Sequence, residues 1–240
     1  MLRAALKLVA ISMGTLMLVG LAVIFVRWMG FQQVFKAPPH PWFARQDWQI
    51  WSPQPAAFCG NDSVDKAVPN EAWIVHIVVK RHQEDWFVEC PSATLKLDEF
   101  LSRQKQTDWL LQVRGHETWG LDQLVDGLKK FERDHHFAIM AEAQKVSIYL
   151  RKKAPEMLFA ADSAVLLRFQ LFANLWIEPA MDFWPDFVVT DFGKGFRLDA
   201  RGAAELQRRQ KRIIWRKSAD ENATPPPQVN IQGIMTTQAE

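Results

Sequence analysis

Two polar side chains, Gln112 and Arg114, stand at the end of a short apolar run that begins at Asp108 and closes at Gly115. A strand in this position would present both side chains at one end of a sheet, because residues two apart share a face. A guanidinium binds phosphate or carboxylate, whereas an amide oxygen can ligate a cation but brings no charge. What these two residues do therefore depends on what the neighbouring strands present.

Acids and histidines also lie near the ends of other predicted strands, where barrel enzymes place their chemistry. They are His82, Glu84, Asp85, Glu89, Glu142, Asp162 and Asp191. A relocated metal site built from them is an alternative, but the chain has 27 acidic residues and loops collect them. We expect His116 in a solvated loop, and His135 and His136 at a helix end, where an imidazolium suits the helix dipole.

The chain has two cysteines, Cys59 and Cys90. They form neither a zinc motif nor a redox motif, because no second cysteine pair and no clustered histidine accompanies them. A disulfide between them requires a location outside the cytoplasm, and their spacing does not decide whether they pair.

Short runs rich in β-branched or aromatic residues alternate along the chain with longer amphipathic runs. The expected strands are Trp48–Trp51, Trp73–Val79, Trp109–Val113, Phe137–Met140, Met157–Ala160, Phe187–Val189, Ile213–Trp215 and Asn230–Met235. Helical periodicity marks Leu121–His135, Ala143–Lys153, Ala164–Leu175 and Ala200–Arg212. Strict alternation predicts parallel strands with crossover helices, and eight strands predict a closed β/α (TIM) barrel of the α/β class.

The barrel is expected to cover residues 48–237. These roughly 190 residues fall below the ~200 to 250 of typical barrels, so we expect some connections to be shortened and irregular. Ser218 to Gln228 contains three successive prolines and predicts an extended linker before the last strand. The formal net charge of +2 gives no field that favours nucleic acid, and the basic cluster Arg208 to Arg216 is expected to be a solvated helix face.

A membrane anchor is predicted at residues 1–29. Leu8 to Val26 contains no charge, and its nineteen residues are just long enough to cross a bilayer core of ~30 Å. A cleaved signal peptide is the competing interpretation, but no small-residue cleavage site follows. The aromatic residues of the juxtamembrane segment 30–47 suit either the lipid interface or packing under the barrel. Arg3 and Lys7 favour a single-pass helix with a cytoplasmic start and the barrel on the extracytoplasmic, periplasmic side.

Several motifs, in their order along the chain, resemble those of the glycerophosphodiester phosphodiesterase family. Leu97 to Leu101 resembles the family's "tLdEfL" helix start, and Leu110 to Arg114 resembles its "lniEiK" strand. Further matches are Ala154 to Phe159 with "lr..aP.l.f", Ile213 to Trp215 with "v.vWTvN" and Gly233 to Thr236 with "GiiTD". The resemblance spans roughly Trp48 to Thr237 and implies a β/α barrel.

The resemblance also implies a site that this chain lacks. Family members hold Ca²⁺ or Mg²⁺ with three carboxylates at strand ends and transfer protons with two histidines. The family's His-Arg-Gly corresponds here to Trp51-Ser52-Pro53, its Glu-Asn-Thr falls near Cys59-Gly60-Asn61, and its His-Asp pair becomes Glu89-Cys90. The two acids of its second strand align with Val75 and Ile77, which we expect on the inner wall, with His76 facing the helices. The third acid is Gln112.

The apolar helix and the resemblance together predict a membrane-anchored barrel, in the inner membrane of a bacterium and related to lipid metabolism, that has lost its catalytic residues and needs no cofactor. The ligand-binding candidates are Gln112, Arg114, Trp215 and Lys217, which could hold an anionic membrane lipid or glycerophosphodiester headgroup. A scaffold role and pairing of Arg114 with a core carboxylate remain open. The alternatives are a divergent phosphoric diester hydrolase that binds Ca²⁺ or Mg²⁺ at a relocated site, and a structural partner of another membrane protein.

Overall fold

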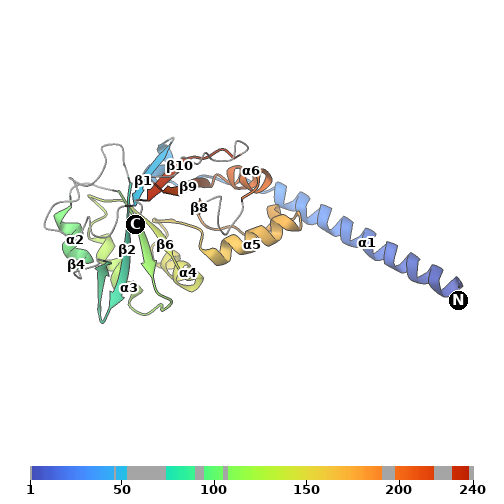
Figure 1. Ribbon diagram of the computed structural model, residues 1–240, viewed down its shortest axis with the longest axis horizontal. Helices are drawn as coiled ribbons and strands as arrows, with labels where there is room; N and C mark the ends of the chain where they lie inside the picture. Colours follow the sequence, from blue (N-terminus) through green and yellow to red (C-terminus); the bar gives the residue numbers. More distant parts are fainter. Residues whose placement is uncertain are drawn as a thin grey trace.

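Alternating apolar and amphipathic runs fold into parallel strands joined by helices. The computed structural model describes residues 2–45, 47–52, 74–89, 95–104, 108–190, 198–218 and 229–237. All eight expected strands are present, in the spatial order β7-β6-β5-β2-β1-β10-β9-β8 (Figure 1). They are β1 (Trp48–Ser52), β2 (Ile74–His82), β5 (Asp108–Arg114), β6 (Phe137–Ala141), β7 (Leu158–Phe159), β8 (Phe187–Thr190), β9 (Arg212–Ser218) and β10 (Gly233–Thr237).

The first and last strands of this order meet and close the sheet. Ala160 forms a parallel bridge with Phe187, and the amide of Ala161 donates to the carbonyl of Phe187 at 2.9 Å. The amide of Asp186 donates to the carbonyl of Phe159 at 2.8 Å. The fold is therefore the predicted α/β barrel, with a short β7 at the seam.

Helices α3 (Leu121–Lys129), α4 (Gln144–Lys153), α5 (Ser163–Asn174) and α6 (Ala200–Arg208) cover the outside of the barrel (Figure 1). Two of them begin at aspartate caps, in which Asp162 accepts from the amide of Val165 at 2.9 Å and Asp199 from that of Gly202 at 2.7 Å. Each cap satisfies a donor that the first helical turn leaves without a partner.

Two helices end earlier than their periodicity predicts. Helix α3 stops at Lys129, so the prediction that His135 and His136 close it is wrong. The ring of His135 is buried and accepts a hydrogen bond from the indole of Trp109 at 3.2 Å, which ties it to the start of β5. The prediction of a solvated helix face at Arg208 to Arg216 is also wrong, because α6 ends at Arg208 and β9 begins at Arg212.

The connection after β2 contains strands that the sequence did not indicate. Strand β2 continues to His82 and turns back at Gln83, which has a φ of 56°, into the antiparallel strand β3 (Asp85–Val88). Strand β4 (Leu95–Lys96) then pairs with β3 and leads into α2 (Leu97–Arg103), which includes the motif Leu97 to Leu101. These elements replace the long helix that usually connects two parallel strands of a barrel. The connection is therefore irregular, as the short length of the barrel predicts.

Apolar side chains pack on both faces of the sheet, in an inner layer that fills the barrel and in outer layers between the strands and the helices. The inner layer takes residues from all eight strands: Trp48, Ile50, Ile74, Leu110, Ala138, Leu158, Phe187, Ile214 and Met235, with Ala160 beside β7. The outer layers place the alternate strand residues, such as Val75, Leu111 and Ile213, against the helices. This alternation decides which side chains reach the mouth of the barrel.

Aromatic residues fill the barrel at the amino ends of the strands. The helical turn η1 (Pro41–Ala44) precedes β1 and buries Trp42, whose carbonyl accepts from the indole of Trp48 at 2.9 Å. The ring of Trp48 meets those of Trp42 and Phe187 edge-on at 5.3 and 5.4 Å. Of the two environments expected for the aromatic juxtamembrane residues, Trp42 and Phe43 occupy the one under the barrel.

Helix α1 (Leu2–Phe31) projects from the body of the protein (Figure 1). Its segment Ile11–Phe31 is long and apolar enough to cross a membrane, and nearly all of its large apolar side chains are exposed, whereas Gly30 near its end is buried against the body. The helix ends two residues past the predicted anchor 1–29, and its carboxyl end packs on the helical turn η4 (Glu178–Ala180). Cys59, Cys90, Asp191 and nearly all of the predicted linker Ser218 to Gln228 lie outside the described residues.

Replacing Trp42 with alanine should destabilise the barrel by about 3 to 5 kcal/mol, because the change leaves a large cavity among buried aromatic rings. Trp42→Phe should cost clearly less, since a ring still fills part of that space. Urea denaturation of the full chain in micelles, followed by tryptophan fluorescence, measures both. Equal losses for the two variants would show that the ring does not support the fold by filling space.

Candidate binding site at the carboxyl end of the barrel

A chain of neutral polar side chains lies inside the barrel toward the carboxyl ends of its strands. Ser52, His76 and Gln112 follow Ile50, Ile74 and Leu110 by two residues, so they continue the inner face of β1, β2 and β5. The Oγ of Ser52 is 2.7 Å from Nδ1 of His76, and Nε2 of His76 is 3.2 Å from Oε1 of Gln112. Because the glutamine oxygen accepts, Nε2 carries the proton and the hydroxyl of Ser52 donates to Nδ1.

The expected faces of β2 are wrong by one residue. Val75 and Ile77 pack between the strands and the helices α2, α3 and α4, while His76 points into the barrel. The pairing of β2 with β5 places Ile74 beside Asp108 and His76 beside Leu110, in a register that sends the even-numbered residues of β2 inward. Since side chains alternate along a strand, a shift of one residue exchanges the two faces completely. The inner positions are therefore His76 and Val78.

Burial and two arginines keep His76 neutral at pH 7. The ring is 7% exposed, and burial is the main cause that lowers its pKa to about 4. The positive charges of Arg216 and Arg114 lower the pKa further, whereas the hydrogen bond with Gln112 opposes them. His76 is therefore a poor proton donor near neutral pH, and its role here is to join β1, β2 and β5.

Arg114 stands at the rim of the barrel between two carboxylates. Its Nη1 lies 2.6 Å from Oε2 of Glu89, and its Nε lies 3.3 Å from Oε1 of Glu142. The amide of Gly115 also donates to Glu142, at 3.4 Å. The three side chains are 33 to 44% exposed, so the arginine pairs with carboxylates at the rim, not in the core.

These donors do not fit the divalent cation that the resemblance implies. No group of three histidine, cysteine, aspartate or glutamate side chains that could hold a metal occurs within the described residues. Val78 and Gln112 occupy inner positions, and the nearby acids Glu89 and Glu142 already contact a guanidinium. A single neutral amide will not hold Ca²⁺ or Mg²⁺ against water.

Other acids considered from the sequence serve the structure. Asp162 caps α5, and Asp85 forms an ion pair with Lys96 at 2.5 Å.

A separate charged cluster lies at the opposite, amino end of the barrel. The carboxylate of Asp108 binds Arg45 at 2.8 Å and Nδ1 of His136 at 2.9 Å. His40 lies in this amino-end cluster, where burial, followed by the charge of His136, lowers its pKa to about 4.

A pocket of about 430 Å³ opens where β2 and β5 end, and we call it the rim pocket. Cationic and aromatic side chains dominate its lining, which includes Lys80, Arg81, His82, Arg114, His116, Trp119 and Glu142. The guanidinium of Arg81 lies 3.5 Å from the centroid of the Trp119 ring and donates to the carbonyl of Trp119 at 2.8 Å. Trp119 is 60% exposed, so its indole offers an open apolar surface beside these cations.

The structure brings only some of the predicted ligand residues together. Arg114 lines the rim pocket, whereas Gln112 points to His76 inside the barrel. Trp215 and Lys217 alternate with the inward Ile214 and therefore share the outer face of β9 with Ile213. The ammonium of Lys217 lies 5.7 Å from the Trp215 ring, and neither residue lines the rim pocket.

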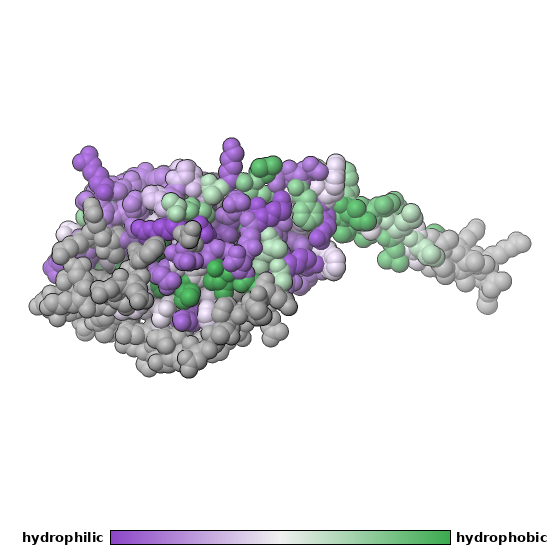
Figure 2. Space-filling model, turned by 90° about the horizontal axis from the view of Figure 1, so that it is seen from above, coloured by the Kyte–Doolittle hydropathy of each residue, from purple (hydrophilic) through white to green (hydrophobic). Residues whose placement is uncertain are grey.

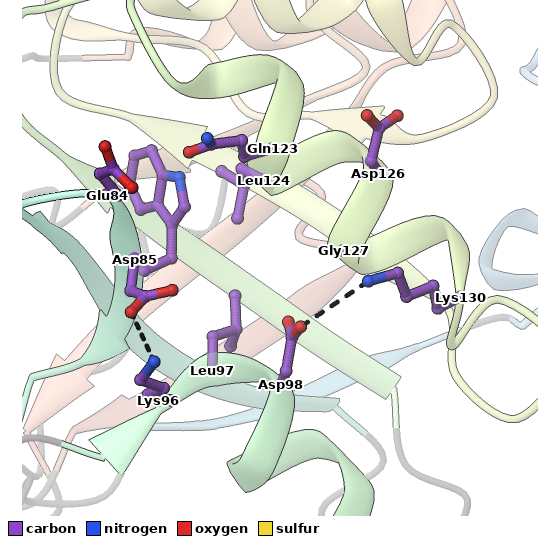
Figure 3. A pocket seen from close by; sticks show the side chains of 11 residues that line it. Glu84, Asp85, Lys96, Leu97, Asp98, Gln123, Leu124, Asp126, Gly127 and Lys130 are labelled. Atoms are coloured by element: carbon purple, nitrogen blue, oxygen red, sulfur yellow. Dashed lines mark ion pairs between the residues drawn. The ribbon is translucent and has the colours of Figure 1, made fainter.

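A second pocket, of about 420 Å³, lies among β3, α2 and α3 on the outside of the barrel. Figure 3 shows acids and lysines of these elements and of the adjoining residues around it, with ion pairs joining Asp85 to Lys96 and Asp98 to Lys130. Its charges are of both signs and partly pair with one another. The rim pocket is the better candidate because it lies at the carboxyl ends of barrel strands and contains Arg114.

Sequence reasoning missed Ser52 and His76 as residues of the mouth, although the chain contains a signal for them. Trp48, Ile50 and Ser52 alternate along β1, and Ile74 and His76 do the same along β2. If the inner face of β1 and β2 is taken as the one that carries Trp48, Ile50 and Ile74, which pack with the inner residues of the other strands, both polar residues fall inside the barrel.

The fold is similar to that of a glycerophosphodiester phosphodiesterase from Agrobacterium tumefaciens str. C58. The TM-score is 0.50 at 10% sequence identity, and the similarity covers 79% of this chain and 94% of that chain. Searches against protein-family models and against curated proteins found no match. The resemblance that the motifs indicate is thus confirmed in the fold of the chain.

The lowered pKa values of His76 and His40 predict a loss of stability in acid. The unfolded chain binds protons on these residues near pH 6.5 and the folded chain only near pH 4, so stability is complete above pH 6.5 and falls as the pH decreases to 4. His76→Gln keeps a donor and an acceptor without titrating. Between pH 6 and 4.5 this variant should lose about 2 kcal/mol less than the wild type.

Urea denaturation of the full chain at the two pH values measures this difference. His82→Gln, which changes an exposed histidine near the end of β2, is the matched control and should follow the wild type. The same pH dependence in His76→Gln and in the wild type would contradict a buried neutral His76.

Proposed function

We propose that this protein is a membrane-anchored binding protein with a glycerophosphodiester phosphodiesterase-like barrel, in which metal-dependent hydrolysis has been lost. Helix α1 holds the barrel at a membrane, and the rim pocket binds an anionic headgroup that contains phosphate. One observation carries the loss of hydrolysis. The inner positions at the mouth hold Ser52, His76, Val78 and Gln112, and the acids beside them, Glu89 and Glu142, are paired with Arg114.

The charges of the rim pocket support an anionic ligand. Lys80, Arg81 and Arg114 outnumber Glu117 and Glu142 in its lining. A phosphate is recognised by ammonium and guanidinium donors, and an exposed indole such as that of Trp119 can cover the uncharged part of a headgroup. Arg114 must share its donors with Glu89 and Glu142, so Lys80 is the cation in this pocket that we expect to matter most.

The apolar helix supports the anchor. Ile11–Phe31 has the length and composition of a membrane span, although a signal sequence near the amino terminus has similar properties. Retention of the helix agrees with its packing on the body, because Arg27 donates to the carbonyl of Trp176 at 2.9 Å. With Arg3 and Lys7 on the cytoplasmic side, the barrel would face the extracytoplasmic side, which in a bacterial inner membrane is the periplasm.

We expect the full chain in micelles to release no choline from glycerophosphocholine, with or without Ca²⁺ or Mg²⁺. The reason is the donor set at the mouth, which offers a metal ion one amide and two carboxylates already paired with a cation. A coupled choline assay with a chelator control measures this. Release that the chelator abolishes would overturn the loss of hydrolysis and favour the alternative of a relocated site that uses Glu89 and Glu142.

Changing the charge of the rim pocket should change its affinity for sn-glycerol 3-phosphate. Lys80→Met should weaken binding about fivefold and Glu142→Gln should strengthen it about fivefold, because an exposed charge pair contributes up to about 1 kcal/mol. Lys152→Met, at an exposed position on α4 outside the pocket, is the control. Isothermal titration calorimetry of the full chain measures the three affinities.

Inorganic phosphate, titrated in parallel, separates recognition of the glycerol moiety from recognition of phosphate alone. Equal affinities for the wild type and all three variants would contradict the rim pocket as the binding site. If neither compound binds the wild type, the remaining function is that of a structural partner of another membrane protein.

A further inference from the structure

One face of α5 is apolar but exposed. Leu167, Leu171 and Leu175 follow one another at intervals of four residues, which places them in a single row along the helix and its carboxyl cap. They are 61, 55 and 63% exposed, and the next residue, Trp176, is 62% exposed. The opposite face of α5 packs Val165, Leu166, Phe169 and Ala173 against the barrel or into the interior of the body. We call the row and Trp176 the α5 ridge.

The ridge lies beside the end of α1. The guanidinium of Arg27, on α1, donates to the carbonyl of Trp176 at 2.9 Å and lies 5.8 Å from the centroid of its ring. Figure 1 shows the carboxyl end of α5 next to the part of α1 that meets the body, and Figure 2 shows apolar residues along α1 from the point where it leaves the body. The α5 ridge therefore ends beside the point where the proposed membrane span leaves the body.

The end of α1 is firmly attached to the body. A side chain at Gly30 would overlap the carbonyl of Pro179 in η4, so the two backbones touch. Arg208, at the end of α6, donates to the carbonyls of Gly30 at 3.3 Å and Gln33 at 3.0 Å. Arg27 also pairs at 3.9 Å with Glu178, whose side chain is buried.

A buried arginine holds η4 itself in place. Arg209 is 1% exposed and donates to the carbonyls of Met181, Glu178 and Pro179 at 2.6 to 3.0 Å. Its Nε also binds Glu205 of α6 at 2.6 Å. Because these contacts connect α1, η4 and α6, α1 cannot turn freely relative to the α5 ridge.

Aromatic and cationic side chains surround the junction. The ring of Trp176 lies near the guanidinium of Arg27 and, at 4.7 Å, near that of Arg201. Trp28 on α1 is 58% exposed, and Arg168 is exposed beside the leucines of α5. Tryptophan and arginine are the residues that accumulate where a protein crosses from lipid to water, since their apolar parts enter lipid while their polar groups remain hydrated.

The length of α1 sets this junction at the level of the lipid headgroups. At ~1.5 Å per residue, the segment Ile11–Phe31 spans about 30 Å, the thickness of the hydrocarbon core. Its carboxyl end, with Trp28, therefore reaches the membrane surface. Trp176 touches this end of the helix and must lie at about the same depth.

We propose that the α5 ridge lies against the bilayer and contacts anionic lipid headgroups, so that the barrel is docked on the membrane surface in one orientation. This inference rests on the proposed anchoring by α1. Lipid is the occupant that the surroundings favour over a second copy of this chain, because the ridge ends beside the proposed membrane span and two arginines at this junction, Arg27 and Arg201, share one carboxylate, that of Glu178. The cluster with Arg168 therefore keeps a positive charge that would repel the same cluster of a copy but attract anionic headgroups. An isolated exposed leucine needs no partner, whereas a row of exposed leucines beside a proposed membrane span indicates an interaction surface.

The test uses the full chain with Cys59→Ser and Cys90→Ser, reconstituted in nanodiscs of phosphatidylethanolamine and phosphatidylglycerol. A single cysteine for an environment-sensitive fluorophore is introduced as Leu171→Cys on the ridge or, as control, as Gln123→Cys at an exposed position on α3. Lipids that carry a spin label near the headgroup should quench the ridge probe at least threefold more than the control probe. Aqueous iodide should show the reverse order.

Adding Leu167→Glu and Leu175→Glu should reduce lipid quenching of the probe at residue 171 by at least half. Both leucines are exposed, so the substitutions should leave the melting temperature of the body unchanged. Nanodiscs of phosphatidylcholine alone should also reduce the quenching, because they lack the anionic headgroups that the arginines attract.

Two results would overturn the proposal while the anchor holds. One is a ridge probe as accessible to iodide as the control probe in protein that resists alkaline carbonate extraction from membranes. The other is a probe shielded from iodide but not quenched by spin-labelled lipid, which would assign the ridge to a second copy of the chain. Release of the full chain by carbonate would instead show that α1 is not an anchor, and would remove the basis of both proposals.

Discussion

The alternation of side chains along eight parallel strands is the constraint on which the remaining structure depends. Once the sheet closes between β7 and β8, each strand must turn one set of alternate residues inward. The interior is filled by large side chains, among them Trp48, Ile74, Phe187 and Met235. Once these residues point inward, the residue two positions further along each strand must also point inward. Ser52, His76 and Gln112 are therefore brought together by the packing of apolar residues below them.

The same constraint explains why the mouth has a chemistry unlike that of the family the motifs resemble. A divalent cation needs several charged oxygen ligands that converge, but the inner positions of β2 and β5 carry an imidazole, a valine and an amide. The acids that do reach the rim, Glu89 and Glu142, both pair with Arg114. At this end of the barrel the guanidinium of Arg114 is thus the cation beside Glu89 and Glu142, and the anionic ligand of the rim pocket that we propose follows from the further cations Lys80 and Arg81 in its lining.

Arginines also determine how the barrel is joined to α1. Buried Arg209 donates to three carbonyls around η4, while Arg27 and Arg208 connect α1 to η4, α6 and Trp176. Removing one partner of such a buried group leaves the others without hydrogen bonds, which is costly, so the junction behaves as one unit. If α1 is the membrane anchor that we propose, this attachment would give the barrel an orientation, whereas an anchor on a loose linker would only keep it near the membrane.

The sequence by itself determined the eight parallel strands, the covering helices and the apolar first helix, because periodicity of two and of 3.6 residues depends only on local order. Tertiary structure decided the rest. It ended α3 at Lys129, since His135 packs on Trp109, and it added the β3 and β4 strands, whose pairing is not visible in a periodic pattern. It also turned His76 inward and Val75 and Ile77 outward. In β2 apolar and polar residues do not alternate, so the sequence of this strand does not reveal which of its faces points inward. Closure of the barrel around Trp42 and Trp48 decides this.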